Sequence, residues 1–142
     1  MKVRDFAQQN KLEGIVEKYI QSSFFLYKKL NISILDFDYD PNTDVVTAEV
    51  APGKDLQAHE GIVHGGIVAT YIDTVGGVHA MLHALRNNQV VFTKDLKIEY
   101  KKPMLVECGY QIISTHTEKS FIVEIKSDNG LVSRAELIFA FK

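Results

Sequence analysis

The chain has 142 residues, of which 46% are hydrophobic and 24% are charged, and its formal net charge is −2. This size and composition predict one globular domain with a sizeable core, and the small net charge gives no case for a nucleic-acid or anionic membrane partner. No apolar run is long enough to predict a membrane span, and the start shows no signal-peptide pattern, so we expect a cytoplasmic protein. A single cysteine, Cys108, forms no internal disulfide, and no Cys/His cluster indicates zinc.

The first predicted element is an amphipathic helix, because apolar residues recur at helical spacing over residues 12–30. Residues 32–39 and 45–50 then alternate between apolar and polar side chains, and the residues 40–43 between them are typical of a turn. These two segments predict a hairpin. Residues 53–63 form a loop ahead of the next helix.

The next helix is the centre of the predicted fold. It begins at residues 64–66, runs to about Leu85 and is apolar nearly all the way round, which is typical of a buried helix. Four strands are expected to follow it, over residues 90–100, 107–116, 120–127 and 131–141. A buried helix flanked by strands on both sides in sequence predicts an α+β domain, in which a curved antiparallel sheet wraps the helix.

The start of this helix is a candidate site. His64, Gly65 and Gly66 leave the first backbone N–H groups uncovered, and such groups attract an anion or a developing oxyanion. Further along, small and polar residues share one stripe of the helix. The stripe consists of Gly66, Thr70, Asp73, Thr74 and Gly77.

Asp73 is the one carboxylate of the stripe, and its burial is costly unless it is paired, hydrogen-bonded or hydrated. A structural role and a catalytic role fit the residue types equally well. Asp73 lies eight residues beyond Gly65, about 12 Å along a straight helix, which is too far for both to act on one carbonyl. If the two cooperate, the carboxylate comes from a second copy of the chain in a two-fold dimer.

These residues carry a family likeness. The segment from Gln57 to Gly66, Asp73, and the strand from Phe92 to Pro103 resemble a hotdog-fold acyl-CoA thioesterase of the phenylacetate-pathway type. The signature of that group is a His-Gly-Gly helix start with Asp nine residues after the His. The likeness covers roughly residues 32–141, so we expect an N-terminal helical extension over 1–31 and a hotdog thioesterase domain over 32–142.

The resemblance implies roles for the candidate residues. It implies a homodimer, often doubled to a tetramer, with an acyl-CoA substrate and no metal or organic cofactor. The thioester oxygen would lie on the Gly65 amide, with Gly66 as a second donor. Asp73 of the partner chain would act as general base or as nucleophile. Thr93 would hold the attacking water or simply lie on a face of its strand, and His64 would shape the turn near the carbonyl.

The substrate-binding residues depart from the family pattern. Ala58 stands where many relatives carry Asn, so Gln57 becomes the candidate for the substrate-orienting amide. Thr74 stands where some relatives have Glu, and Thr74 and Thr70 are expected on the substrate side of the stripe. Glu60, in the nearby loop, either replaces that second carboxylate or is a solvated side chain.

Two further groups of residues could bind a ligand: a histidine pair on the central helix and the basic residues of the later strands. His79 and His83 are four residues apart, a spacing that can bind zinc, but they lie roughly 100° round the helix from Asp73 and lack an intervening Glu, so no metal site is expected. Among the basic residues of the later strands, Lys101 and Lys102 are the candidates for contact with the coenzyme A phosphates, and the rest are expected on a solvated face.

The predicted function is hydrolysis of an acyl-CoA thioester. A non-catalytic acyl-CoA or lipid-binding protein with the same pocket is the alternative. Asp73 and the glycines favour the enzyme, and the missing Asn at residue 58 weakens that case. A hotdog hydratase is a third possibility, although the Asp/His pattern expected for it is not visible.

Overall fold

The computed structural model describes residues 1–22, 28–30 and 32–142. Two short helices begin the chain, α1 (Val3–Gln9) and α2 (Glu13–Ser22), and the long helix α4 (Gly65–Arg86) lies in its middle. The strands are β1 (Asp38–Asp40), β2 (Val45–Val50), β3 (Gln57–His59), β4 (Ile62–Val63), β5 (Val91–Tyr100), β6 (Tyr110–His116), β7 (Phe121–Ser127) and β8 (Gly130–Phe141). None of the helices described here is both long and apolar enough to cross a membrane.

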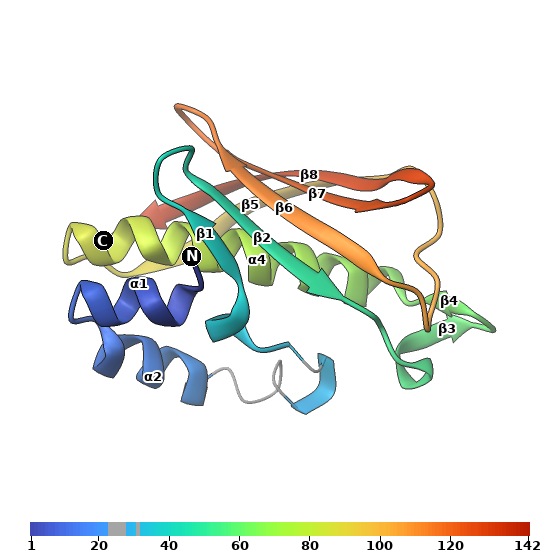
Figure 1. Cartoon of the computed structure of the whole chain (residues 1–142). Helices are drawn as coiled ribbons and strands as arrows, with labels where there is room; N and C mark the ends of the chain where they lie inside the picture. The colour runs from blue at the N-terminus through green and yellow to red at the C-terminus, as the bar shows by residue number, and fades with distance from the viewer. Residues whose placement is uncertain (23–27, 31) are drawn as a thin grey trace.

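The main sheet curves over one side of α4. Within the described part of the chain its strands are all antiparallel neighbours, in the order β1-β2-β6-β7-β8-β5. Figure 1 shows the sheet arching across α4, with α1 and α2 on the opposite side of the helix and the small β3–β4 hairpin at the end where α4 begins. The predicted α+β architecture, a curved antiparallel sheet around a central helix, is confirmed.

Helix α4 is buried because its apolar side chains point in most directions. Val68, Ile72, Val75 and Val78 all belong to the core that the helix shares with the sheet. Gly76 lies tightly against the sheet: a Cβ there would lie 3.1 Å from both the Leu137 and the Val123 side chains. The absence of a side chain at this residue therefore lets α4 settle onto β7 and β8.

The sheet has one long open edge. β5 pairs with β8 along its whole length, and no other described strand pairs with its second side. Large apolar side chains are exposed on this strand, with Phe92 at 49% and Tyr100 at 55% of their full accessibility. A long edge strand with exposed apolar side chains is a ready surface for pairing with another chain.

The N-terminal region differs from its prediction. One helix was expected over 12–30; residues 13–22 and 28–30 are helical, residues 23–27 lie outside the described residues, and an additional short helix, α1, precedes them. The strand expected over 32–39 is reduced to β1, because Ile34–Asp36 forms a 3₁₀ turn closed by the bond from the Phe37 N–H to the Ile34 carbonyl. Its alternating pattern thus reflects burial in a turn, which periodicity alone does not distinguish from a strand.

The other strands follow the prediction closely. The expected strand over 107–116 begins at Tyr110, and the tight turn between Ser127 and Gly130 is present, with Gly130 at a φ of +107°. The loop expected over 53–63 contains the short β3–β4 hairpin, turned by Gly61 at a φ of +80°. That hairpin delivers the chain to the start of α4.

Candidate active site

The first turn of α4 presents one free backbone donor. His64 is the N-cap residue, and its Nδ1 accepts a hydrogen bond of 2.9 Å from the Gly66 N–H. The Gly65 N–H has no hydrogen-bond partner among the described residues, and Gly65 is exposed. Expected as a pair of donors, the two glycines therefore differ: Gly66 is occupied by the cap, and Gly65 is available to an anion.

A shallow pocket lies beside this free donor. Tyr100, at the end of β5, donates a hydrogen bond of 3.0 Å to the Gly65 carbonyl and so holds one wall against the helix start. The pocket has a volume of about 450 Å³. Its lining comprises Ala58, His59, Ile62, Val63, His64, Gly65, Val68, Tyr100, Lys101, Lys102, Pro103 and Met104.

Asp73 lies two turns further along α4, and its partner comes from β5. The Thr93 hydroxyl donates a hydrogen bond of 2.6 Å to Asp73 Oδ1, and Asp73 is half-buried. The two threonines of the stripe differ from Thr93, because each donates to a helix carbonyl: Thr70 to that of Gly66 and Thr74 to that of Thr70. Their hydroxyl protons serve the helix backbone, so Thr93 is the hydroxyl that orients the carboxylate.

The free donor and the carboxylate are separated within one chain. Helix α4 is continuous from Gly65 to Arg86. A rise of about 1.5 Å per residue therefore puts Asp73 about 12 Å from Gly65 along the axis. A general base has to reach a water next to the carbonyl that the donor binds. The two groups of one chain therefore do not form one site by themselves.

Of the remaining predicted contacts, Lys101 and Lys102 line the pocket, whereas Gln57 precedes the lining residue Ala58 and does not line it. Gln57 is exposed, and its Oε1 accepts from the Gly61 N–H at 3.0 Å, which leaves its amide hydrogens free to meet a ligand. Lys101 pairs with Glu99 at 2.8 Å, and the Lys102 ammonium donates to the Asn129 carbonyl at 2.7 Å. Both lysines are exposed. Exposed polar contacts of this kind contribute little, so either lysine can exchange its partner for a phosphate at small cost.

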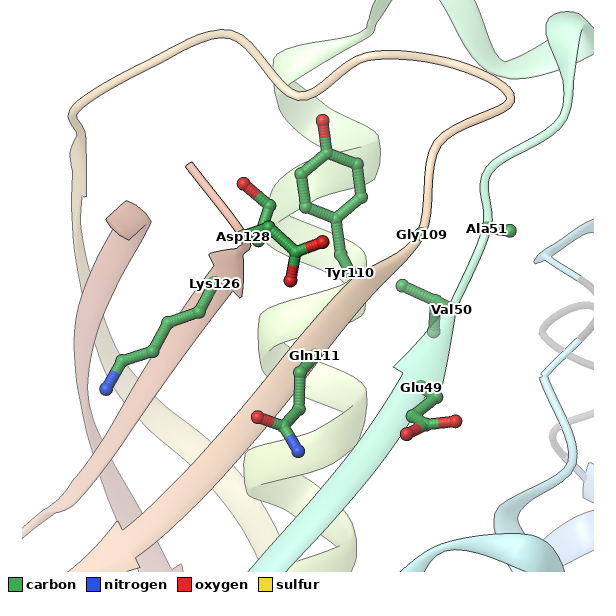
Figure 2. A pocket seen from close by; sticks show the side chains of 9 residues that line it. Glu49, Val50, Ala51, Gly109, Tyr110, Gln111, Lys126 and Asp128 are labelled. Carbon is green, nitrogen blue, oxygen red and sulfur yellow. The ribbon is translucent and has the colours of Figure 1, made fainter. Parts of the chain in front are cut away.

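A second hollow of about 610 Å³ lies at the ends of β2, β6 and β7. Figure 2 shows Glu49, Gln111 and Lys126 on the strands around it and Asp128 in the turn after β7, away from the helix start. None of the predicted site residues lines this hollow, and its acidic side chains make it a poor site for a polyanion.

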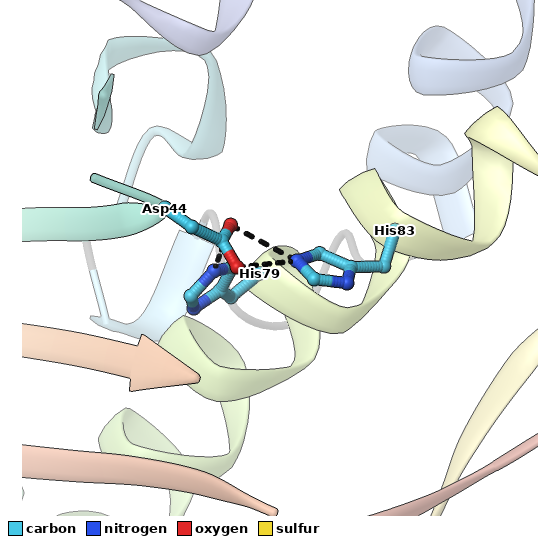
Figure 3. A group of neighbouring side chains, drawn as sticks. All are labelled: Asp44, His79 and His83. Carbon is cyan, nitrogen blue, oxygen red and sulfur yellow. Dashed lines mark hydrogen bonds and ion pairs between the residues drawn. The ribbon is translucent and has the colours of Figure 1, made fainter. Parts of the chain in front are cut away.

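A polar cluster near the C-terminal half of α4 is not evident from the sequence. His79 and His83 both contact the Asp44 carboxylate, each at 2.9 Å, as Figure 3 shows. His116, at the end of β6, lies 3.5 Å from the same carboxylate. The sequence identified the spacing of His79 and His83 but offered no partner, because Asp44 and His116 are brought there by the register of β2 and β6.

Burial and hydrogen bonding set the charges of this cluster. Burial lowers the pKa of His79 to about 4, although the hydrogen bond that its ring donates to Asp44 raises it, so the ring is neutral near pH 7. Burial also raises the pKa of Asp44, but the hydrogen bonds with His79 and His83 outweigh this and lower it to about 2. The cluster thus contains a carboxylate anion against a buried neutral imidazole.

Comparison with known proteins shows which proteins the chain resembles. Residues 60–126, which include Gly65, Asp73 and Thr93, match the family model of the thioesterase superfamily. The chain is also 42% identical, over 94 residues, to the acyl-coenzyme A thioesterase THEM4 of Rattus norvegicus, covering 61% of this chain. It spans 39% of that relative's length.

Solved structures share the fold. A phenylacetic acid degradation-related protein of Ralstonia eutropha superposes with a TM-score of 0.67 at 15% identity, covering 80% of this chain and 87% of the other. A Streptococcus mutans protein bound to acetyl CoA superposes with a TM-score of 0.62 at 15% identity, covering 78% and 92%. The resemblance to hotdog-fold acyl-CoA thioesterases is therefore confirmed, in sequence over the central segment and in fold over most of the chain.

Proposed function

We propose that this protein is an acyl-CoA thioesterase, which hydrolyses an acyl-CoA to a carboxylate and free coenzyme A. The observation that carries the proposal is the presence of two groups on one buried helix: the unpartnered Gly65 N–H, and the Asp73 carboxylate, which Thr93 orients. The match to thioesterases spans both residues, and a relative of the same fold binds acetyl CoA.

In this mechanism the thioester oxygen accepts the Gly65 N–H. The helix N-terminus carries a partial positive charge, so negative charge that develops on the oxygen is stabilised there. Asp73 of the partner subunit takes a proton from water as the water oxygen bonds to the carbonyl carbon, and the C–S bond then breaks. The proton passes to the departing thiolate. The same carboxylate can instead attack the carbonyl itself and form an anhydride that water cleaves.

The open edge of β5 supports the dimer that this mechanism needs. In antiparallel pairing of β5 with its own copy about a two-fold axis, the Thr93 end of one strand meets the Tyr100 end of the other. In each chain Thr93 is bonded to Asp73 and Tyr100 is bonded to Gly65. Pairing of this kind therefore brings the carboxylate of one copy towards the free donor of the other, twice per dimer.

The pocket mouth supplies the contacts for the coenzyme. Lys101 and Lys102 line the pocket beside Gly65 and are suited to the phosphates. The free amide hydrogens of Gln57 orient the acyl carbonyl or the pantetheine amides. Thr70 is half-buried and its oxygen can still accept a hydrogen bond from a ligand, whereas Thr74 is buried, and neither residue lines the pocket beside Gly65.

The alternative is an acyl-CoA-binding protein without turnover. The observation that favours it is Ala58, which lines the pocket at the position where many relatives place Asn. One amide side chain that holds the substrate carbonyl is therefore absent from this part of the pocket.

Thiol release from a panel of short, long and aromatic acyl-CoAs tests the proposal. We expect turnover by the parent chain and a loss of about 10²–10⁴-fold in Asp73→Asn, with the dimer retained by light scattering. Asp128→Asn, which changes an exposed carboxylate in the other hollow, is the matched control and keeps the parent rate. Tight acyl-CoA binding without thiol release would establish the alternative, and full activity in Asp73→Asn would exclude Asp73 as the base.

A further inference from the structure

Four metal-ligating side chains converge at a second place on α4, away from the candidate active site. His79 and His83 lie one turn apart on the helix, Asp44 comes from the turn before β2, and His116 ends β6. The pairing of Val45 with Thr115 in the sheet brings Asp44 and His116 to the same end of their strands. Three segments distant in sequence thus meet at one carboxylate.

The donor atoms are close enough to share one ion. The Nε2 atoms of His79 and His83 each lie 2.9 Å from Asp44 Oδ1, and the ligand atoms of these three residues lie within 4.8 Å of one another. His116 Nδ1 is 3.5 Å from Asp44 Oδ2. Zinc bonds of about 2.0–2.1 Å in a tetrahedron separate their donor atoms by about 3.3 Å. The contacts with Asp44 therefore differ from this separation by a few tenths of an ångström, and a pair of ligand atoms as far apart as 4.8 Å has to close by about 1.5 Å to hold an ion.

The surrounding groups orient the ligands as metal sites require. The buried Ser114 hydroxyl lies 2.8 Å from His79 Nδ1, which turns the opposite nitrogen of that ring towards Asp44. Ligating histidines in proteins are held in this way through their second ring nitrogen. The Tyr39 hydroxyl lies 3.2 Å from Asp44 Oδ1 and accepts a bond from Arg86, so the carboxylate is fixed as well.

The site is accessible and its donors are selective. Asp44 and His116 each keep 31% of their side-chain accessibility and His83 keeps 22%, so an ion can enter from solvent. Imidazole nitrogen suits Zn²⁺, Cu²⁺ and Ni²⁺, whereas Mg²⁺ and Ca²⁺ prefer sites made of oxygen. Asp44, His79 and His83 are the three ligands that lie together, and His116, 3.5 Å from Asp44, is the nearest further imidazole that would complete a set of four, which is typical of a structural site.

We propose that Asp44, His79, His83 and His116 bind one divalent transition-metal ion of the zinc type. The ion ties the β1–β2 turn and the end of β6 to the C-terminal half of α4. The proposal does not rest on thioester hydrolysis, because none of the four residues lines the pocket beside Gly65.

Zinc titration of the untagged full chain tests the site. After treatment with a chelator and its removal, we expect one Zn²⁺ per chain by native mass spectrometry and calorimetry, and a raised melting temperature. Co²⁺ used in its place gives the visible absorption of a four-coordinate ion. Millimolar Mg²⁺ does not compete.

Two partly exposed ligands allow substitution with little risk to folding. We expect His83→Gln and His116→Gln each to weaken zinc binding at least about tenfold. His59→Gln, which changes an exposed histidine of β3 outside the cluster, keeps the parent affinity and is the matched control. Circular dichroism confirms that each variant is folded. The absence of stoichiometric zinc binding in the parent, or unchanged affinity in either ligand variant, would overturn the proposal.

Discussion

The two ends of α4 differ in how their polar groups are hydrogen-bonded. At its start, Gly65 is exposed with a free N–H, and Asp73, which is bonded to Thr93, lies about 12 Å further along the helix. In its C-terminal half, His79 is fully buried and both of its ring nitrogens have partners from the same chain. The first end thus has a backbone donor without a partner in the chain, and the second has polar side chains that are bonded to one another.

The difference follows from where each end lies. The start of α4 contacts the Tyr100 end of β5, the edge strand of the described sheet, where water and a second chain can reach it. The later turns pack under β2 and β6, where an unpaired polar group would cost about 1–3 kcal/mol. A site for a substrate or a partner is therefore built at the first end, and internal polar groups at the second have to satisfy one another.

Of the changes at the two ends of α4, removal of the free donor is expected to have the largest effect. Gly65→Pro deletes the N–H while the helix keeps its start, because proline is favoured at the first helical position and His64 has the extended backbone, φ −55° and ψ 133°, that a following proline requires. We expect kcat for thioester hydrolysis to fall about 10²–10³-fold. Steady-state kinetics with the best acyl-CoA measures this.

Gly65→Ala is the matched control for that substitution. It keeps the N–H, and its added Cβ meets the Tyr100 ring at 3.9 Å, an ordinary contact. We expect a rate within a few-fold of the parent. Equal losses in the proline and alanine variants would mean that the volume at Gly65, rather than its donor, controls the rate.

Mixed dimers test whether the first end is completed by a second copy. Gly65→Pro and Asp73→Asn each inactivate both sites of their own dimer. In a heterodimer, one site combines the intact donor of one chain with the intact carboxylate of the other. After subunit exchange of an equal mixture, half of the dimers are mixed and each has one good site, so activity returns to about a quarter of the parent value.

The unmixed variants give the baseline for that measurement. Exchange is followed by native mass spectrometry, with one variant isotopically labelled. Mixed dimers that form without any gain over this baseline would show that donor and carboxylate are not shared across the interface.

At the second end, the expected loss is of stability. Asp44→Asn removes the charge that His79 and His83 contact, and asparagine tolerates the φ of +55° at this residue as aspartate does. Hydrogen bonds to a charged group contribute about 1.5–3 kcal/mol. We expect the free energy of unfolding in urea, with chelator present, to fall by about 1–3 kcal/mol.

Asp36→Asn provides the comparison for the charge alone. Its carboxylate pairs with Arg4 at the exposed surface, where such pairs contribute about 0–1 kcal/mol. A loss in Asp44→Asn no larger than that in Asp36→Asn would mean that the cluster adds nothing beyond an ordinary surface pair.

The parts that were predictable from the sequence are those encoded by local spacing. The all-round apolar pattern of α4, the Gly65–Asp73 separation and the strong Ser127–Gly130 turn each depend on residues close together in the chain. The link between Asp44 and His79 depends instead on the register of β2 against β6 and on how α4 crosses both strands. No spacing within one segment contains that information.

Side-chain roles at the helix start were harder to predict than its position. That His64 occupies the Gly66 N–H depends on one rotamer, and that Thr70 and Thr74 bond the helix backbone depends on another. Each of these polar groups has several partners within reach, and small differences in packing select one. The sequence therefore predicted where the donor is, and the structure assigns it to Gly65.

The smallest expected effect concerns Gly76, where α4 packs against the sheet. Gly76 lies between Asp73 and His79, and a Cβ there would lie 3.1 Å from Leu137 and from Val123, tighter than an ordinary contact. Alanine is favoured over glycine in a helix by up to about 1 kcal/mol, but extra volume in a packed core costs about 1–3 kcal/mol. We expect Gly76→Ala to lower the free energy of unfolding by about 1 kcal/mol, measured by urea denaturation.

Gly14→Ala isolates the helix preference from the packing cost. Gly14 lies in α2, and a Cβ added there meets nothing within 4 Å, so this substitution should raise stability by up to about 1 kcal/mol. Opposite signs at the two glycines are expected because only Gly76 lies against the sheet. If Gly76→Ala also stabilised the protein, the sheet would have to yield at Leu137 and Val123, and α4 would be free to shift. Asp73 and His79 would then move together, because they lie on either side of Gly76 on one helix.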